Sequence, residues 1–227
     1  MKHSIKSRCL RPVVAAIGCL AMALPAIAGA QVFGSDPESL KRTDKLIGGA
    51  EDLISEATKA RQEIDKTLTS YNALFKNDVQ DVRKAYKDVE KGIERTEKQR
   101  EEVKKKLDAM KLEADAYFSS WTESLQQIND ESLRKRSEGR MTETKGHFDG
   151  VLAAVDKARG QYEPFVANLK DQWTYLGHDL NPSGIASLKP DADKLNGKAT
   201  DLFKSIDDGM KKAGEYIDSL KSARPVS

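Results

Sequence analysis

The chain has 227 residues, of which 33% are charged, and the formal net charge is +2. Four of its basic residues lie within the first eleven positions, and without them the net charge becomes −2. This balance excludes a protein that binds nucleic acid through a general basic surface. The length suffices for one substantial domain, and the abundance of Lys, Asp, Glu, Ala and Leu is typical of long helices.

Residues 1–30 have the three parts of a secretory signal peptide: a basic start, an apolar middle and a small-residue end. The apolar stretch runs from Pro12 to Leu24, and Ala28-Gly29-Ala30 provides a cleavage signature. We therefore expect cleavage near Ala30 and export to the periplasm or the medium. Cleavage would also remove both cysteines, Cys9 and Cys19, leaving no disulfide and no thiol nucleophile.

Two other interpretations of this segment are weaker. Cys19 follows Ala16-Ile17-Gly18 and could carry a lipid, but the apolar run continues beyond it to Leu24. An uncleaved membrane anchor would need about 20 apolar residues, whereas this stretch is bounded by Pro12 and Pro25. A soluble exported protein is the favoured interpretation.

After the signal, we predict a disordered lead over residues 31–35, one helical domain over 36–222 and a frayed tail over 223–227. Asp36 and Pro37 are a suitable cap and first residue for a helix. Counting in sevens from Leu40 to Tyr117, ten of the twelve positions are apolar. Such a repeat predicts long helices that each bury one narrow seam.

The apolar positions otherwise follow each other in alternate steps of three and four residues. This alternation slips between Phe75 and Val79, because the steps from Tyr71 to Phe75 and from Phe75 to Val79 are both of four residues. A slip of this kind is either a stutter in one helix or a tight connection between two. The pair Asn77-Asp78 favours a connection, because Asp78 could cap the second helix. We expect that second helix to end near Asn129-Asp130-Glu131.

A third helix is indicated by a ladder in steps of seven from Met141 to Leu176. Pro164 lies within it and should remove a hydrogen bond and produce a kink. The helix should stop at His178, with Asn181 adopting a left-handed cap and Pro182 preventing continuation. A fourth helix is predicted from about Leu195 to Leu220. The fold class expected is all-α: an elongated antiparallel bundle of about four long helices with coiled-coil-like seams.

Catalytic and cofactor-binding motifs are missing from the sequence. His147 and His178 are the histidines that remain after cleavage, and neither has Glu three residues before it, as di-iron bundles require. The segment Asn196-Gly197-Lys198-Ala199 lacks the upstream glycine and the hydroxyl residue of a phosphate-binding loop. We therefore predict no catalytic residue, no metal site, no cofactor and no enzymatic activity.

Two groups of aromatic residues could form an interaction patch, although packing in the core is the more ordinary role for them. One group lies towards the end of the second helix and the other towards the end of the third. Their members are Tyr117, Phe118, Trp121, Phe165, Trp173 and Tyr175.

The stretch from Tyr162 to Leu188 resembles a bacterial family of exported helical proteins classified as a domain of unknown function, DUF2959. It includes Tyr162-Glu163-Pro164-Phe165 and Leu176-Gly177-His178-Asp179-Leu180-Asn181-Pro182. The similarity extends over about residues 36–222, and it implies a helical fold and export without implying an activity.

Three functions follow as hypotheses. The first is a non-enzymatic envelope protein with a protein-interaction or structural role, with a protein partner or self-association. The alternative is a membrane-active or ligand-sequestering bundle that exposes its apolar seam, with Gly48-Gly49 and Pro164 as weak points. A carboxylate-based hydrolase is third and is disfavoured.

Overall fold

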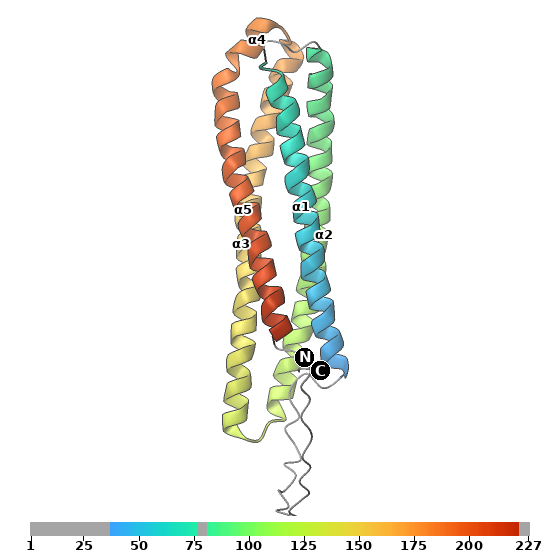
Figure 1. Cartoon of the computed structure of the whole chain (residues 1–227), viewed down its shortest axis with the longest axis vertical. Coiled ribbons are helices and arrows are strands. Elements are labelled where there is room, and N and C mark those ends of the chain that lie inside the picture. The colour runs from blue at the N-terminus through green and yellow to red at the C-terminus, as the bar shows by residue number, and fades with distance from the viewer. Residues whose placement is uncertain (1–36, 77–80, 223–227) are drawn as a thin grey trace, which may run out of the picture. The chain divides into compact units, whose positions relative to one another are not determined.

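The computed structural model describes residues 37–76 and 81–222, and every secondary-structure element within these ranges is a helix (Figure 1). The helices are α1 (Pro37–Ala73), α2 (Val82–Gln126), α3 (Glu131–His178), α4 (Pro182–Ser187) and α5 (Lys189–Ser222). Four of them are long and pack side by side as an antiparallel bundle, which confirms the predicted fold class. The predicted signal peptide, lead segment and tail lie outside the described residues.

Two separate helices lie on either side of the slip in the apolar repeat, as predicted. Helix α1 ends at Ala73, and a final turn follows in which Leu74 N donates to Tyr71 O at 3.1 Å. The sequence suggested Asp78, which lies outside the described residues, as the cap of α2; the cap in the structure is Asp81, whose Oδ1 accepts from Lys84 N at 2.8 Å. An aspartate three residues further on serves the same purpose, because it satisfies an otherwise unpaired N–H of the first turn.

Helices α2 and α3 meet at a short loop where the sequence predicted a stop. Asp130 caps α3 by accepting from Leu133 N at 2.9 Å, so the segment Asn129-Asp130-Glu131 separates the two helices and also begins the second of them. Helix α3 then continues without interruption through Pro164 to His178. Both Pro164 and Gly160, whose carbonyl loses its helical donor, are exposed, so water can replace the missing hydrogen bond.

The end of α3 differs in detail from the prediction. His178 is the last residue and Asp179 the C-cap, but Asn181 is extended, with φ −131° and ψ 167°, and is not left-handed. Its side-chain oxygen instead accepts from Ser183 N and Gly184 N, at 3.0 and 2.9 Å, and so caps the short helix α4. Gly184 is required here, because a Cβ would overlap the carbonyl oxygen of Asp179.

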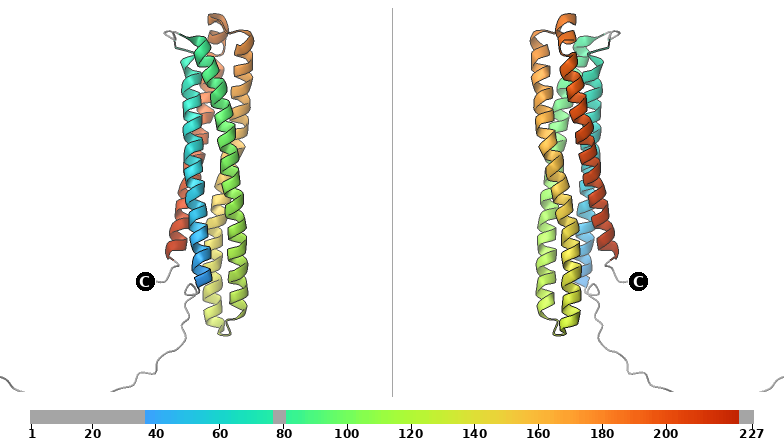
Figure 2. Two further views of the ribbon diagram at one scale, coloured as in Figure 1. Left: turned by 90° about the vertical axis from the view of Figure 1, so that its right-hand side faces the viewer. Right: turned by 90° about the vertical axis from the view of Figure 1, so that its left-hand side faces the viewer.

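The four long helices form a ring in the order α1, α2, α3, α5 (Figure 2). Helix α1 packs closely on α2, and α3 packs closely on α5, so the bundle consists of two helix pairs. The pairs meet mainly through α1 and α5, whereas α2 and α3 approach each other least. The seam between α2 and α3 is therefore the loosest of the four.

The apolar core is divided into two clusters along the bundle. The upper core lies towards α4 and includes Ile64, Leu68, Tyr71, Phe165, Leu169 and Leu202. The lower core lies towards the α2–α3 loop and includes Leu46, Leu53, Met110, Phe148, Tyr216 and Leu220. Each cluster takes side chains from all four long helices, so each holds one end of the bundle together.

Polar side chains cross-link the upper core. Tyr71 and Gln172 are both buried, and the Tyr71 hydroxyl donates to Gln172 Oε1 across the diagonal between α1 and α3. Burial raises the pKa of Tyr71, which keeps its phenol protonated as a donor. Asn72 and Asn196 exchange amide hydrogen bonds of 2.9 Å in both directions, joining α1 to α5. These contacts fix the register of the helices at this end.

A close approach of α1 and α2 at Gly92 provides a test of the packing. A Cβ on Gly92 would lie within 2.6 to 3.0 Å of three side-chain atoms of the fully buried Thr67. Overpacking of this kind costs about 1–3 kcal/mol, which exceeds the gain in helix propensity of about 1 kcal/mol. We predict that Gly92→Ala lowers the free energy of unfolding, measured by urea denaturation.

The matched control is Gly197→Ala, inside α5, where a Cβ would meet nothing within 4 Å. It should raise the free energy of unfolding by up to about 1 kcal/mol. Equal effects of the two substitutions would contradict the close approach of α1 and α2 at Gly92.

Candidate functional site: a central apolar cavity

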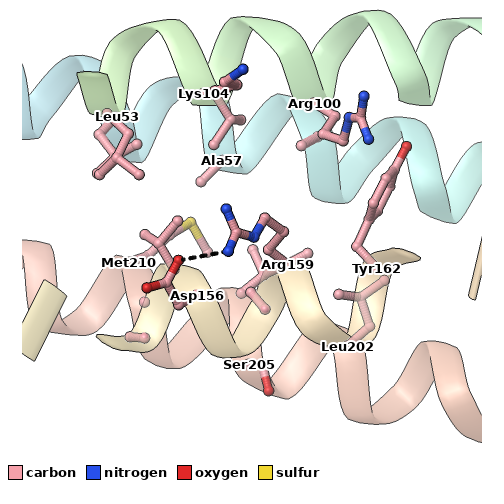
Figure 3. A pocket seen from close by; sticks show the side chains of 18 of the residues that line it. Leu53, Ala57, Arg100, Lys104, Asp156, Arg159, Tyr162, Leu202, Ser205 and Met210 are labelled. Carbon is pink, nitrogen blue, oxygen red and sulfur yellow. Dashed lines mark ion pairs between the residues drawn. The ribbon is translucent and has the colours of Figure 1, made fainter. Parts of the chain in front are cut away.

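A cavity of about 330 Å³ lies between the upper and lower cores and is lined by all four long helices (Figure 3). Ile64 and Leu202 of the upper core border it at one end, and Leu53 and Leu107 of the lower core at the other. An engineered cavity of roughly 150 Å³ in another protein is large enough to bind benzene. The space is therefore large enough for a small organic molecule.

The cavity exists because small residues face the bundle axis at this level. Helices α1, α3 and α5 each contribute two of them, and the six residues are Ala57, Ala60, Ala154, Ala158, Gly209 and Ala213. At the levels of the two cores, the corresponding inward positions include Leu, Ile and Tyr. Helices held apart by large side chains at both ends cannot close onto alanine and glycine between them.

The lining is apolar inside and charged on one side. Helices α1 and α5 contribute no charged residue to it, whereas α2 and α3 contribute eight. These eight are Arg100, Glu101, Lys104, Asp108 and Lys111 from α2, and Asp156, Arg159 and Glu163 from α3. Because charged side chains remain in contact with water, the cavity opens to solvent between α2 and α3, along the loosest seam.

Ion pairs bridge this seam on the side of the opening nearer to α4. Arg100 Nη1 lies 3.1 Å from Glu163 Oε1, and Lys170 Nζ lies 2.5 Å from Glu97 Oε1. Tyr162 is buried beside this bridge, and its hydroxyl points towards Arg100 in Figure 3. Burial raises the pKa of Tyr162 to about 12, so its hydroxyl is protonated at neutral pH.

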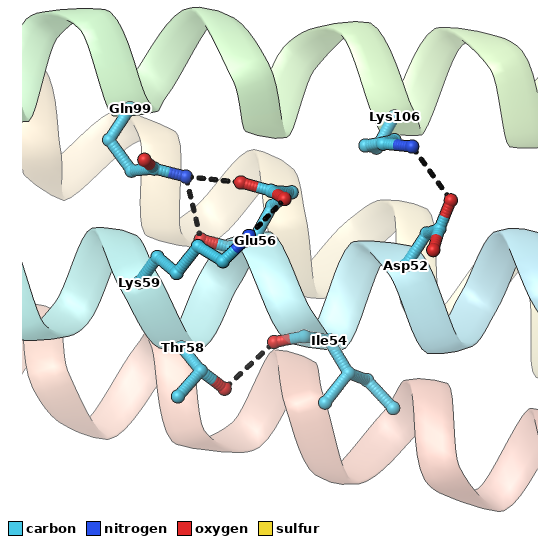
Figure 4. A network of polar contacts seen from close by, with 7 residues as sticks. All are labelled: Asp52, Ile54, Glu56, Thr58, Lys59, Gln99 and Lys106. Carbon is cyan, nitrogen blue, oxygen red and sulfur yellow. Dashed lines mark hydrogen bonds and ion pairs between the residues drawn. The ribbon is translucent and has the colours of Figure 1, made fainter.

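The seam between α1 and α2 is cross-linked at the same level (Figure 4). Gln99 Nε2 donates to Glu56 Oε2 at 2.5 Å, and Lys106 Nζ lies 2.7 Å from Asp52 Oδ2. Hydrogen bonds from Lys59 and Gln99 lower the pKa of Glu56 and keep it ionised. These contacts hold α2 on α1, so an opening between α2 and α3 does not require α2 to leave its partner.

The aromatic residues predicted as an interaction patch do not line the cavity, and they form two separate groups. Trp121 is buried and packs edge-to-face on Tyr117, with the ring centroids 5.5 Å apart. Its Nε1 donates to Ser137 Oγ at 3.0 Å. Phe118 lies beside them, in contact with the lower core. Packing inside the bundle accounts for Trp121, whereas Tyr117 and Phe118 are half-buried, so an interaction role for this first group stays a prediction.

The second aromatic group surrounds the upper core. Phe165 is 1% exposed, and Trp173 stacks on Tyr86 with ring centroids 5.2 Å apart. Tyr175 is 43% exposed, whereas Trp173 is half-buried, and the Tyr175 hydroxyl lies 3.1 Å from Ser187 Oγ. The two groups belong to opposite ends of the bundle and do not make one surface.

The histidines lie apart from the cavity as well. His147 is half-buried on α3, and His178 is exposed at the end of the same helix. Within residues 37–76 and 81–222, no three His, Cys, Asp or Glu side chains are grouped so that they could hold a metal ion. None of the helices in these ranges is long and apolar enough to cross a membrane.

Substitutions at two alanines of α1 test whether the cavity is unfilled by side chains. Ala50 and Ala57 are seven residues apart, but Ala50 is fully buried in the lower core, whereas Ala57 lines the cavity. Leucine at position 57 can enter empty space, so Ala57→Leu should leave the free energy of unfolding unchanged or raise it by about 1 kcal/mol. Leucine at position 50 overpacks the core, so Ala50→Leu should lower it by about 1–3 kcal/mol. Thermal or urea denaturation gives both values, and similar losses in both variants would rule out the cavity.

Comparison with known proteins identifies a family. No curated protein and no solved structure shows significant similarity to the chain. A family model described as "Protein of unknown function (DUF2959)" matches residues 38–220, which include all of α2 to α4 and nearly all of α1 and α5. This match confirms the resemblance seen in the sequence. The chain therefore belongs to the DUF2959 family.

Proposed function

We propose that this protein is a non-enzymatic binding protein that takes up a small apolar or amphipathic molecule in its central cavity. The observation that carries the proposal is a cavity of about 330 Å³ with an apolar interior and one charged side. Pockets that hold small molecules have volumes of about 300–1,000 Å³ and combine apolar walls with a few polar groups. This is the ligand-sequestering alternative considered from the sequence.

The architecture supports uptake without unfolding. The upper and lower cores lie on either side of the cavity along the bundle, so each end stays packed when the middle of the α2–α3 seam widens. The cross-links between α1 and α2 lie at the same level and remain intact in such a movement. A ligand could therefore enter from the side, between α2 and α3.

A hydrolytic function has less support. At the opening, Glu163 is paired with Arg100 at 3.1 Å and Asp156 with Arg159 at 3.4 Å. A general acid or base must reach the proton that it transfers, whereas these two carboxylates face arginine side chains. We therefore place these carboxylates in ion pairs at the mouth of the cavity.

A protein-interaction role is the second candidate. Leu112 on α2 is 72% exposed and Leu133 on α3 is 49% exposed, and both could contact a partner. Single exposed leucines are common on protein surfaces, so the cavity carries the stronger argument. Capture of a specific partner by the wild-type protein, lost in Leu112→Glu, would favour this second role.

The proposed uptake can be measured with N-phenyl-1-naphthylamine, a neutral apolar dye whose fluorescence rises in apolar surroundings. We expect saturable binding at one site per chain. The double variant Ala57→Leu/Ala158→Leu fills the cavity from α1 and α3 and should bind at least about tenfold more weakly.

The matched control is Ala153→Leu, which adds the same side chain at an exposed position of α3. It should bind the dye as the wild type does. Circular dichroism and thermal denaturation establish that each variant is folded. Unchanged binding by a folded Ala57→Leu/Ala158→Leu variant would refute the cavity as the binding site.

A further inference from the structure

The register of the α2–α3 seam places like charges opposite each other at the mouth of the cavity. The ion pair between Arg100 and Glu163 fixes which residues face each other. Because the two helices are antiparallel, four residues further along α2 correspond to four residues back along α3. Lys104 therefore faces Arg159, and both residues line the cavity, from opposite sides of the opening (Figure 3). Two cations at this position repel each other and oppose closure of the seam.

Neither cation is strongly paired. Among the residues that the structure describes, Lys104 has no acidic partner within 4 Å. Arg159 lies 3.4 Å from Asp156 on its own helix, but the two side chains are 68% and 64% exposed. Exposed pairs of this kind contribute little and exchange readily with other partners. The mouth therefore offers two positive charges that a single bound anion could neutralise.

The position of the anion is restricted along the seam. Asp108 lies one helical turn beyond Lys104, and Asp156 one turn before Arg159, so the acids face each other on the side towards the lower core. On the other side, Glu163 and Glu101 are both already paired with Arg100. An anionic group is thus favoured at the level of Lys104 and Arg159 and repelled from the level of Asp108 and Asp156.

The apolar part of the cavity is elongated along the bundle. Its lining on α1 extends from Leu53 to Ile64 and on α5 from Leu202 to Ala213. At 1.5 Å per residue, each stretch is about 16 Å long. A volume of about 330 Å³ spread over this length is narrow, and it suits one flexible hydrocarbon chain better than a broad ring system or a lipid with two chains.

We propose that the cavity binds a single-chain anionic amphiphile, with its anionic head group between Lys104 and Arg159 and its hydrocarbon chain among the alanines and Gly209. The inference rests on the proposed function, because it names the class of ligand for the same cavity. A carboxylate and a phosphate monoester share the required chemistry, since each can accept hydrogen bonds from both a lysine and an arginine. Competitors with a carboxylate or a phosphate head group distinguish these two classes of ligand.

The test is displacement of N-phenyl-1-naphthylamine by amphiphiles of equal chain length below their micelle concentrations. The competitors are dodecanoate, dodecyl phosphate, dodecan-1-ol and dodecyltrimethylammonium. We expect at least one anion to displace the dye at a concentration about tenfold lower than the cation does, given two partly screened ion pairs. Preference for dodecanoate would indicate a fatty-acid-like ligand, and preference for dodecyl phosphate a phosphorylated one.

The charge-reversal variant Lys104→Glu/Arg159→Glu should lose this preference for anions. Its matched control is Lys105→Glu/Lys157→Glu, which changes the net charge equally at exposed neighbouring positions that do not line the cavity. The control should retain the preference. Equal displacement by anion and cation in the wild type, or equal behaviour of the two folded variants, would overturn the inference while leaving dye binding intact. Absence of dye binding in the wild type would instead overturn the proposed function, and this inference with it.

Discussion

The size of the side chains that face the bundle axis determines the rest of this structure. Large residues such as Leu68 and Phe165 at one end, and Leu46 and Phe148 at the other, set the distance between the helices. A helix is too stiff to bend inwards over a few turns and then out again, so this distance persists in the middle. There six alanine and glycine residues lie among larger ones such as Ile206 and Met210, and the space that the small residues leave contributes to the cavity.

The closeness of the packing between neighbouring helices then determines where the cavity opens. Helix α1 is tied to α2 by the contact of Glu56 with Gln99. It is tied to α5 by Arg61, which lies 2.9 Å from Asp207 and 4.8 Å from the centre of the Phe203 ring. Helices α2 and α3 approach each other least, and their charged residues border the cavity. A path from solvent to an apolar interior thus lies between these two helices.

Much of the fold could be predicted from the spacing of apolar residues. The ladders that end at Phe75 and Leu176 correspond to real helices, because a seam repeated over many turns outweighs single unfavourable residues such as Pro164. The caps were harder to assign. Asp81 and Asn181 act as N-caps, where the sequence suggested Asp78 and a left-handed Asn181, since several neighbouring polar residues can satisfy a free N–H.

The cavity could not be predicted in the same way. Alanine is compatible with a buried seam, so Ala57 on α1 and Ala158 on α3 appear ordinary when each helix is considered alone. Their effect depends on the register between helices, which places the small residues of α1, α3 and α5 at one level. Of the aromatic residues named from the sequence, Trp121 and Phe165 belong to the packing of the two ends, whereas Tyr175 is exposed.

The central claim is that an apolar space persists between the two cores, and diffraction from crystals pressurised with xenon tests it most directly. Xenon enters apolar cavities without needing a specific chemical partner. We predict a xenon atom between Ala57, Ala158 and Met210, and its loss in the Ala57→Leu/Ala158→Leu variant. Side chains packed into that position, with no xenon bound there in the wild type, would contradict the claim.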